Sequence, residues 1–230
     1  MDEALLQLLK SVDTPTVCNA IEVAQGRRGF DRFTRVVPVA TDSAGGAMVG
    51  FARTATIAAA APAADPVEQV RALRMAYYRY VAEAPQPAVV VIQDIDPQPV
   101  GAYWGEINAN VHKGFGIKGV LTNGLVRDLG DLPDDFPIFA GDIGVSHGFV
   151  HVCDIDVPVK VFGLEMRPGE LVHADRHGAL VVPSDVIPEL ADAIGRLHES
   201  EAIVLDAARA PGFDFARFEI AWAAFERSRT

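Results

Sequence analysis

The chain has 230 residues, of which half are hydrophobic and 22% are charged, so it can bury a sizeable core and is not expected to be disordered. Acidic residues outnumber lysine and arginine 31 to 20, giving a net charge of −11, which disfavours non-specific binding to nucleic acid or anionic lipid. The acidic N-terminus argues against a signal peptide, and no apolar run approaches the roughly 20 residues of a membrane span. We therefore expect a cytoplasmic protein without a nucleic-acid or membrane partner.

The first part of the chain predicts helices in alternation with apolar strands. In chain order we expect a short amphipathic helix over 3–10, a helix from Asp13 or Thr14 to Gly26, a strand within 27–40, a longer strand within 45–60, a helix beginning at Asp65-Pro66 and a strand over 87–92. Pro15 suits the first position of the second helix. The loose alternation within 45–60 indicates a strand that is buried on both faces.

The segment 101–131 carries the strongest functional pattern. Its Gly-Glu pair at 105–106 opens a helix, and an apolar strand follows at 119–122. Asn123-Gly124 then gives a turn signal. A helix N-terminus and the end of a buried strand are thus supplied by one short piece of chain.

The last part of the chain changes from strands to helices. Several short strands are expected over 136–183, and their frequent turn signals favour antiparallel pairing. From about Ser184 to the end the chain is predicted to be helical. Two apolar stripes support this, one formed by Ile187, Leu190, Ile194 and Leu197, the other by Phe215, Phe218, Ile220, Ala221 and Phe225.

These elements predict one α/β domain over residues 1–230, with a core at about 13–183 and C-terminal helices over 184–230. Fully apolar strands followed by short helices favour a layered β/β/α arrangement over a doubly wound sheet.

Residues 105–108 (Gly-Glu-Ile-Asn) are a candidate seat for a carboxylate. Gly105 leaves room for a ligand, and the first N–H groups of the helix, with its dipole, favour an anion. Gly105, Glu106, Ile107 and Asn108 are therefore the predicted substrate-binding residues. The alternative is an ordinary helix N-terminus with an acid in its first turn.

Arg127 and Asp128 follow the buried strand at its carboxyl end, where α/β proteins commonly bind ligands. The arginine offers a planar fork for a carboxylate or a developing enolate. Asp128 and Asp131 could hold Mg²⁺ or Mn²⁺ directly or through water. The alternative is a surface Arg–Asp pair on a turn.

The stretch His173-Ala-Asp175-Arg-His177 would project three metal-ligand types to one side if it were extended. Asp175-Arg-His-Gly178 is also typical of a hairpin turn, which we favour. His112, on a helix, and His147 and His151, in strands, are interpreted as packing or surface residues, with His147 an outside candidate for proton transfer.

Covalent catalysis is the weaker alternative. Ser146 lacks a G-x-S-x-G elbow, and Cys153 has no evident histidine partner. A Schiff-base role for Lys118 or Lys160 stays open, but nothing selects either lysine.

Several stretches together resemble one family. They are WGE at 104–106, GVLTNGLVRD at 119–128, FPIFA at 136–140 and RPGELVHADRHGALVVP at 167–183. The chain resembles the RraA-like family, which includes class II pyruvate aldolases acting on 4-hydroxy-4-methyl-2-oxoglutarate. The similarity runs from about residue 13 to 183, and its most specific part is Gly105 followed by Arg127-Asp128-Leu-Gly-Asp131.

The resemblance implies a β/β/α swivelling-type domain in a homotrimer or homohexamer, with sites at subunit interfaces. It implies that backbone amides at 105–108 bind the carboxylate of a small 2-oxo acid, that Arg127 polarises the keto oxygen and that Asp128 binds Mg²⁺ or Mn²⁺. Together the metal and the arginine would stabilise a pyruvate enolate. Oxaloacetate decarboxylation would pass through the same enolate.

Two functions follow from the resemblance. The first is a metal-dependent lyase acting on a 4-hydroxy-2-oxo acid or oxaloacetate. The second is a non-catalytic regulator that binds and inhibits an RNA-processing enzyme. Arg127, Asp128 and Asp131 favour the enzyme, whereas Asn123, where many family members have Asp, is expected to mark a different substrate.

Overall fold

The computed structural model describes residues 1–41 and 46–228. The chain forms two compact units, one made of Met1–Thr14 and Asp31–Ser184, the other of Pro15–Phe30 and Asp185–Thr230. The expectation of one domain over the whole chain stays a prediction.

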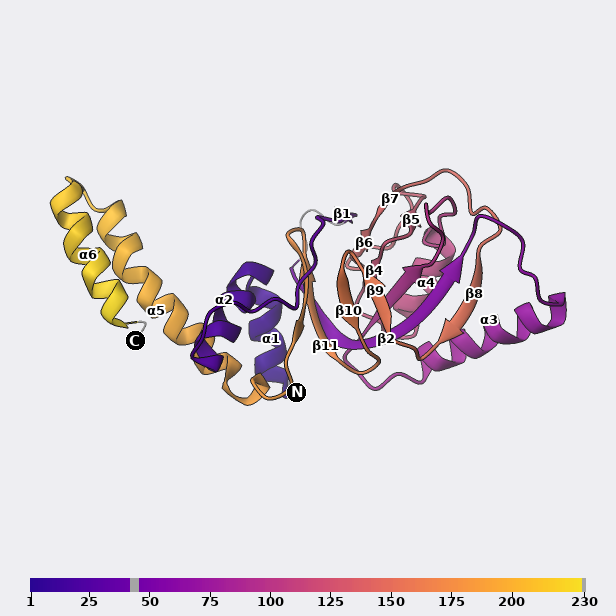
Figure 1. Cartoon of the computed structure of the whole chain (residues 1–230), viewed down its shortest axis with the longest axis horizontal. Coiled ribbons are helices and arrows are strands. Elements are labelled where there is room, and N and C mark those ends of the chain that lie inside the picture. The colour runs from indigo at the N-terminus through magenta and orange to yellow at the C-terminus, as the bar shows by residue number, and fades with distance from the viewer. Residues whose placement is uncertain (42–45, 229–230) are drawn as a thin grey trace. The chain divides into compact units, whose positions relative to one another are not determined.

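An eight-stranded, strongly curled sheet dominates the first unit (Figure 1). Its main path runs β1 (Val39–Ala40), β6 (Ile138–Ala140), β4 (Val120–Thr122), β3 (Ala88–Asp94), β2 (Met48–Ala58), β11 (Leu171–Asp175) and β12 (Gly178–Val182), and β8 (His151–Ile155) also pairs with β2. The pairs β2–β3, β3–β4 and β4–β6 are parallel, and the other pairs of this sheet are antiparallel.

Smaller elements cover this sheet. They are the antiparallel hairpin of β9 (Val159–Val161) and β10 (Leu164–Met166), the parallel pair of β5 (Leu125–Val126) and β7 (Asp142–Ile143), and the helices α1 (Glu3–Ser11), α3 (Val67–Ala82) and α4 (Glu106–Gly114).

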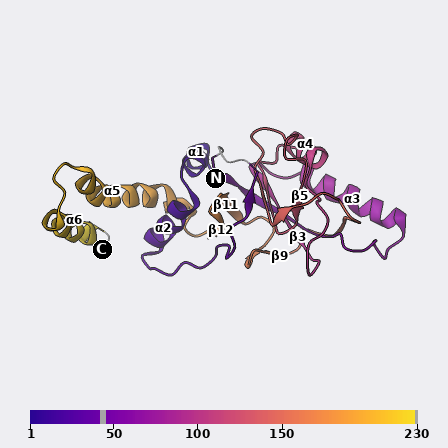
Figure 2. The ribbon, with the colours of Figure 1, turned by 90° about the horizontal axis from the view of Figure 1, so that it is seen from above.

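Alternation along β3 separates two apolar cores. Val90 and Ile92 pack with residues of α3 and α4, whereas Val89 and Val91 pack with the β9–β10 hairpin. Seen from above (Figure 2), α4 and β9 accordingly lie on opposite sides of β3. Successive strand residues point to opposite faces, so the apolar residues 88–92 of this strand serve both layers. The predicted β/β/α layering is confirmed.

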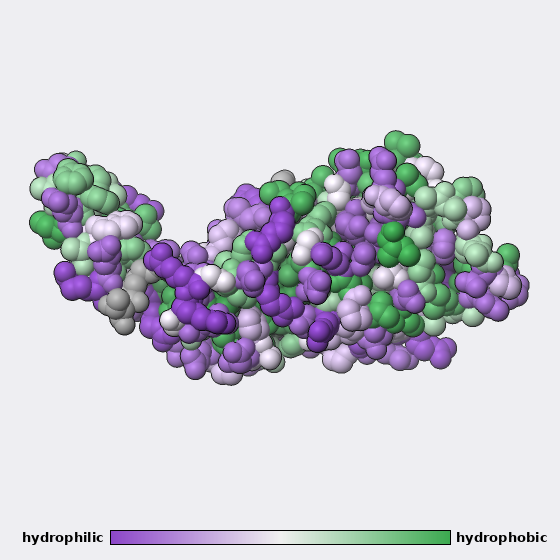
Figure 3. Space-filling view, viewed as in Figure 1, coloured by the Kyte–Doolittle hydropathy of each residue, from purple (hydrophilic) through white to green (hydrophobic). Residues whose placement is uncertain are grey.

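The second unit contains α2 from Pro15 onward, the short 3-10 turn η1 (Ile187–Glu189), α5 (Leu190–Arg209) and α6 (Phe215–Ser228). α2 spans Thr14–Gln25, and Gly26 follows it with a φ of +61°, a left-handed conformation that glycine adopts without strain. α5 and α6 pack on each other. Phe213 and Phe215, at the turn between them, are exposed. Figure 3 shows apolar surface among the polar groups of this helix pair. The predicted C-terminal helices are confirmed.

The strand expected within 27–40 is present as β1, but it is short, and the rest of the segment makes one isolated bridge of Phe33 with Leu180. Pairing over 136–183 is not purely antiparallel, because β6 and β7 pair in parallel with β4 and β5. The long strand within 45–60 is present as β2, and Gly45 at its predicted start lies outside the described residues.

No helix among the described residues is long and apolar enough to cross a membrane.

Candidate active site

Gly105 begins the candidate site as the N-cap of α4. Its backbone is extended, and no side chain of its own satisfies the first N–H groups of the helix. The regular helical bonding starts when the Ala109 N–H donates to the Gly105 carbonyl. The N–H groups of Ile107 and Asn108 precede this bond, so they remain available to a ligand.

A short parallel bridge brings Arg127 to this helix start. Trp104 bridges to Val126, and the Arg127 N–H donates to the Trp104 carbonyl over 2.8 Å. The strand end predicted to present Arg127 and Asp128 therefore runs alongside the residue that precedes Gly105. The structure brings the two halves of the segment 101–131 together.

The Asp128 carboxylate occupies part of the helix N-terminus. Its Oδ2 accepts a hydrogen bond of 3.2 Å from the Glu106 N–H and lies 3.6 Å from the Arg127 Nε. Asp128 has a φ of +57°, a left-handed conformation that non-glycine residues adopt at some cost. The expectation that substrate would occupy the whole turn 105–108 must be refined, because Asp128 holds its first N–H.

Arg127 is poised for a further partner. Its side chain is 33% exposed, while its Nε atom is buried and makes no hydrogen bond among the described residues. A buried donor without an acceptor costs free energy, so an anion or a polar oxygen at this point would be stabilised.

Asp131 lies on the same turn, since its N–H donates to the Asp128 carbonyl over 2.9 Å. Glu106 and Asp131 are both exposed. Over residues 1–41 and 46–228, no three His, Cys, Asp or Glu side chains are arranged as a metal site. The roles predicted for Asp128 and Asp131 as metal ligands stay predictions.

Tyr78 of α3 helps to hold α4 in place through Asn108. The Tyr78 hydroxyl donates to Asn108 Oδ1, and Asn108 Nδ2 donates to the Tyr103 carbonyl, each over 2.6 Å. The Asn108 side chain thus fixes the entry of the chain into the helix. Only the backbone N–H of Asn108 can therefore contribute to the predicted anion seat.

His112 is a packing residue, as predicted. Its Nδ1 donates to the Asn108 carbonyl (2.6 Å), so its Nε2 accepts from the Tyr77 hydroxyl (2.7 Å). Full burial lowers the pKa of His112 to about 4. The imidazole is therefore neutral near pH 7 and helps to anchor α4 on α3.

Sequence reasoning missed a polar pair at the carboxyl ends of β3 and β4. The Asn123 side chain accepts from the Asp94 N–H and donates to the Asp94 carbonyl, both over 2.8 Å. The position expected to mark a different substrate therefore makes a double tether between two strand ends. The position of Asp94 at the end of an apolar run is the feature of the sequence that could have identified it.

Asp94 itself is 2% exposed, and its Oδ2 has no hydrogen-bond partner among the described residues. Its Oδ1 accepts from the Asp96 N–H. Burial raises the pKa of Asp94 to about 6, although this N–H acts in the opposite direction.

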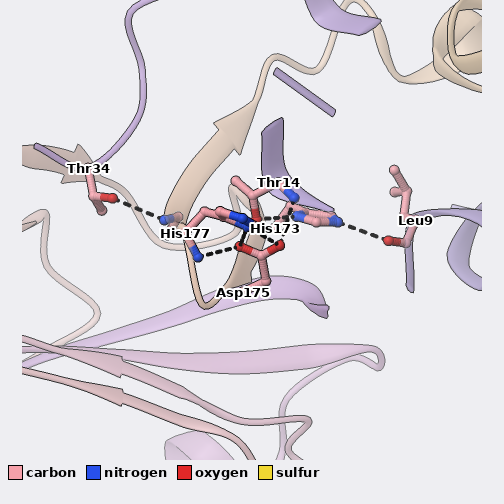
Figure 4. A network of polar contacts seen from close by, with 7 residues as sticks. Leu9, Thr14, Thr34, His173, Asp175 and His177 are labelled. Carbon is pink, nitrogen blue, oxygen red and sulfur yellow. Dashed lines mark hydrogen bonds and ion pairs between the residues drawn. The ribbon is translucent and has the colours of Figure 1, made fainter. Parts of the chain in front are cut away.

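The His173–His177 stretch forms the β11–β12 hairpin, so the turn interpretation is confirmed. His173 uses both ring nitrogens, Nε2 donating to the Leu9 carbonyl and Nδ1 accepting from the Thr14 hydroxyl (Figure 4). Asp175 accepts from the N–H groups of Thr14 and His177. Although burial acts to raise the pKa of Asp175, these bonds hold it below its ordinary value. Both ring nitrogens of His173 and both carboxylate oxygens of Asp175 are therefore engaged in bonds that hold the hairpin.

The other histidines lie elsewhere. His151 begins β8, as expected of a strand residue, but His147 lies in the turn before it. Cys18 and Cys153 are both free and half-buried.

Comparison with known proteins adds three findings. A model of the RraA-like family, described as Aldolase/RraA, matches residues 14–181. A protein of Halalkalibacterium halodurans named as a 4-hydroxy-4-methyl-2-oxoglutarate aldolase is 29% identical over 99 residues, which are 42% of this chain and 47% of that protein. The chain aligns with between 19% and 49% of the length of the curated relatives it matches.

Solved structures agree on the fold. An uncharacterised protein of Pseudomonas syringae superposes with a TM-score of 0.73 at 21% identity, covering 97% of this chain and 94% of the other. RraAS2 of Streptomyces coelicolor, described as an unusual member of the RNase ES inhibitor RraA protein family, has a TM-score of 0.67 at 25% identity, covering 87% and 95%. At 21% identity, the similarity to the Pseudomonas syringae protein shows the fold alone.

Proposed function

The chain belongs to the RraA-like family, and from this we propose that it is a divalent-metal-dependent lyase that cleaves a 4-hydroxy-2-oxo acid or oxaloacetate to release pyruvate. The family contains both aldolases and RraA regulators, so membership alone does not select the activity. The selection rests on the residues of the candidate site.

One observation carries the proposal, namely the close packing of Arg127 and Asp128 on Gly105. A Cβ atom at position 105 would lie 2.4 Å from Asp128 Oδ2 and 3.1 Å from Arg127 Nε. Only a glycine leaves room for both charged groups at the start of α4. A guanidinium, a carboxylate and free helix N–H groups are the parts that a 2-oxo acid site needs.

The residues fit a divalent cation that is held largely by water and substrate. Mg²⁺ commonly keeps several waters and takes one or two carboxylates. The Asp128 side chain is 36% exposed and gives one oxygen to the Glu106 N–H, which leaves Oδ1 for a cation. Asp131 and Glu106 could bind the coordinated waters. When bound, the cation supplies positive charge that favours an enolate over the ketone.

The protein groups then act as follows. The N–H groups of Ile107 and Asn108, with the positive end of the α4 dipole, bind the substrate carboxylate. The Arg127 guanidinium donates to the keto oxygen and stabilises the negative charge that grows there as the carbon–carbon bond breaks. The Arg127 backbone N–H is already bonded to the Trp104 carbonyl, and its Nε already lies beside the Asp128 carboxylate. Little reorganisation of the arginine is therefore needed.

The decisive experiment measures oxaloacetate decarboxylation with Mg²⁺ or Mn²⁺ against metal alone. We expect the protein to add turnover that EDTA abolishes. Asp128→Asn should lower this excess at least about 100-fold, and Asn tolerates the left-handed backbone. Asp135→Asn is the matched control, because Asp135 has a φ of +54° and lies outside the site. Absence of metal-dependent turnover with oxaloacetate and a panel of 4-hydroxy-2-oxo acids would refute the lyase.

A regulator that binds an RNA-processing enzyme is the second candidate. The similarity to RraAS2, whose description names an RNase ES inhibitor family, favours it. A pull-down and inhibition assay with a purified RNase E-type enzyme separates the two functions. Inhibition that survives Asp128→Asn, without turnover by the wild type, would favour the regulator.

A further inference from the structure

A pocket of about 660 Å³ lies beside the candidate site in the first unit. It is bounded by the N-terminal half of α3, by residues 147–151 and by Tyr103 and Asn108 at the start of α4. Pockets of this size typically hold small organic ligands. Asn108 also belongs to the turn whose N–H groups form the anion seat, so the pocket adjoins that seat.

The pocket is basic in an otherwise acidic chain. Arg71 and Arg74 project from α3, and Asp65 is the one acidic residue among the described residues of its lining. Arg71 has an exposed contact of 3.5 Å with Glu68. The chain as a whole carries a net charge of −11, so this concentration of arginine favours an anionic ligand locally.

Two histidines offer free nitrogen atoms to the pocket. The Nδ1 of His147 bonds to the Gly148 carbonyl (2.7 Å) and that of His151 to the Phe149 carbonyl (2.8 Å). A carbonyl can only accept, so both Nδ1 atoms carry hydrogen. Each Nε2 is therefore left to accept from a ligand hydroxyl or, once protonated, to donate to a carboxylate.

Tyr103 forms part of the pocket lining. Its side chain is 8% exposed, and its hydroxyl is enclosed near Tyr77 and Tyr78. Burial keeps the pKa of this hydroxyl well above its ordinary value, and Arg74 lies near enough to act on it electrostatically. The phenol therefore stays neutral and contributes to the wall of the pocket.

The remaining wall is apolar. Val67 is 64% exposed and Phe149 57% exposed, and Val70 also belongs to the lining. Exposed apolar groups beside arginines suit a ligand that has a hydrocarbon body and a charged end.

We propose that this pocket binds an organic acid with an apolar body, whose carboxylate is held by Arg74 and Arg71. On the proposed function, the pocket receives the part of the substrate beyond the pyruvate unit. The residues that line it then determine which 4-hydroxy-2-oxo acid is cleaved.

The test is calorimetric titration of metal-free protein with 3-phenylpropionate, which has an apolar body and a carboxylate but no 2-oxo group. We expect saturable binding, and at least about tenfold weaker binding of the neutral amide. Arg74→Gln should weaken binding by at least about tenfold and Arg71→Gln by a smaller factor. Arg79→Gln, on the same helix but outside this pocket, should leave the affinity within about twofold.

Lack of binding by the wild type, equal binding of the amide, or an equal loss in Arg79→Gln would overturn the proposal. Circular dichroism of each variant establishes that the fold is kept, and Arg71→Gln serves if Arg74→Gln is unfolded. The titration uses neither metal nor turnover. A failed lyase assay therefore does not affect its result, and an empty pocket does not refute the lyase.

Discussion

Gly105 and Asp128 lie so close that a methyl group on the glycine would stand 2.4 Å from the aspartate Oδ2. The contact joins the first turn of α4 to the strand end that carries Arg127. It makes the placement of both charged side chains depend on a single missing Cβ atom.

Gly105→Ala should therefore remove activity while sparing the fold. The new Cβ would push the Asp128 carboxylate away from the Glu106 N–H, and a displacement of about 1 Å can cost about 100-fold in rate. The atoms that it meets belong to the side chains of Asp128 and Arg127 and not to the backbone, so the unfolding free energy should change by less than about 2 kcal/mol. Metal-dependent oxaloacetate decarboxylation and urea denaturation measure the two effects.

Gly114→Ala is the control on the same helix. A Cβ there meets nothing within 4 Å, so activity should match the wild type. If Gly105→Ala retained full turnover, the proposed geometry would be wrong.

Asn123→Asp should destabilise the protein, although the family resemblance leads one to expect Asp at this position. A carboxylate cannot donate to the Asp94 carbonyl, so one bond of the tether becomes a repulsion between two acceptors. The expected loss is about 1–3 kcal/mol at pH 7.5. A protonated carboxyl can donate again, so the deficit should shrink towards pH 4. Urea denaturation at both values tests this, and a deficit independent of pH would contradict the tether.

Asp94 makes stability fall as pH rises. Its folded pKa of about 6 exceeds the ordinary 3.8, so between these values the folded state holds more protons than the unfolded state. This contribution is complete below pH 3.8, is lost progressively up to about pH 6 and stays absent above it. The whole effect is on the order of 3 kcal/mol.

Asp94→Asn should remove this pH dependence, because the amide stays neutral and its oxygen can still accept from the Asp96 N–H. Relative to the wild type, the variant should gain unfolding free energy between pH 4 and pH 7.5. A constant difference between the two proteins across this range would show that Asp94 does not titrate there.

Elements with local signals could be predicted from the sequence. Gly105-Glu106 marks the start of α4, Gly26 ends α2, and Asp175-Arg-His-Gly178 makes a hairpin turn. In each case the residues that determine the structure are neighbours in the chain. The family resemblance added the pairing of Gly105 with Arg127.

Features that depend on strand register could not be predicted. Asn123 meets Asp94 because β3 and β4 are parallel with Ile92 opposite Thr122, and nothing near either residue reveals this. The basic pocket likewise combines α3 with a distant turn.

The strand within the segment 27–40 is shorter than its residues suggest. Its β-branched residues favour a strand, yet Val36 and Val37 are 56% and 70% exposed. Residues 32–35 bond separately to β12 and to Phe162, so regular pairing is confined to Val39–Ala40, which pairs with β6. His147 was placed in a strand for a similar reason, but Gly148, with a φ of +54°, turns the chain there.

The pairing of β2 bears on how the chain acquires its structure. One edge of β2 pairs with β3, and the other pairs first with β11 and then with β8. Between these two neighbours, the Thr54 N–H bonds to the Tyr80 hydroxyl. Two of the three partner strands come from the far part of the sequence, so closing these long loops carries an entropic cost before any contact is gained. The pairing of these distant strands is thus expected to limit the rate of folding, whereas the helices, whose contacts are local, are expected to form earlier.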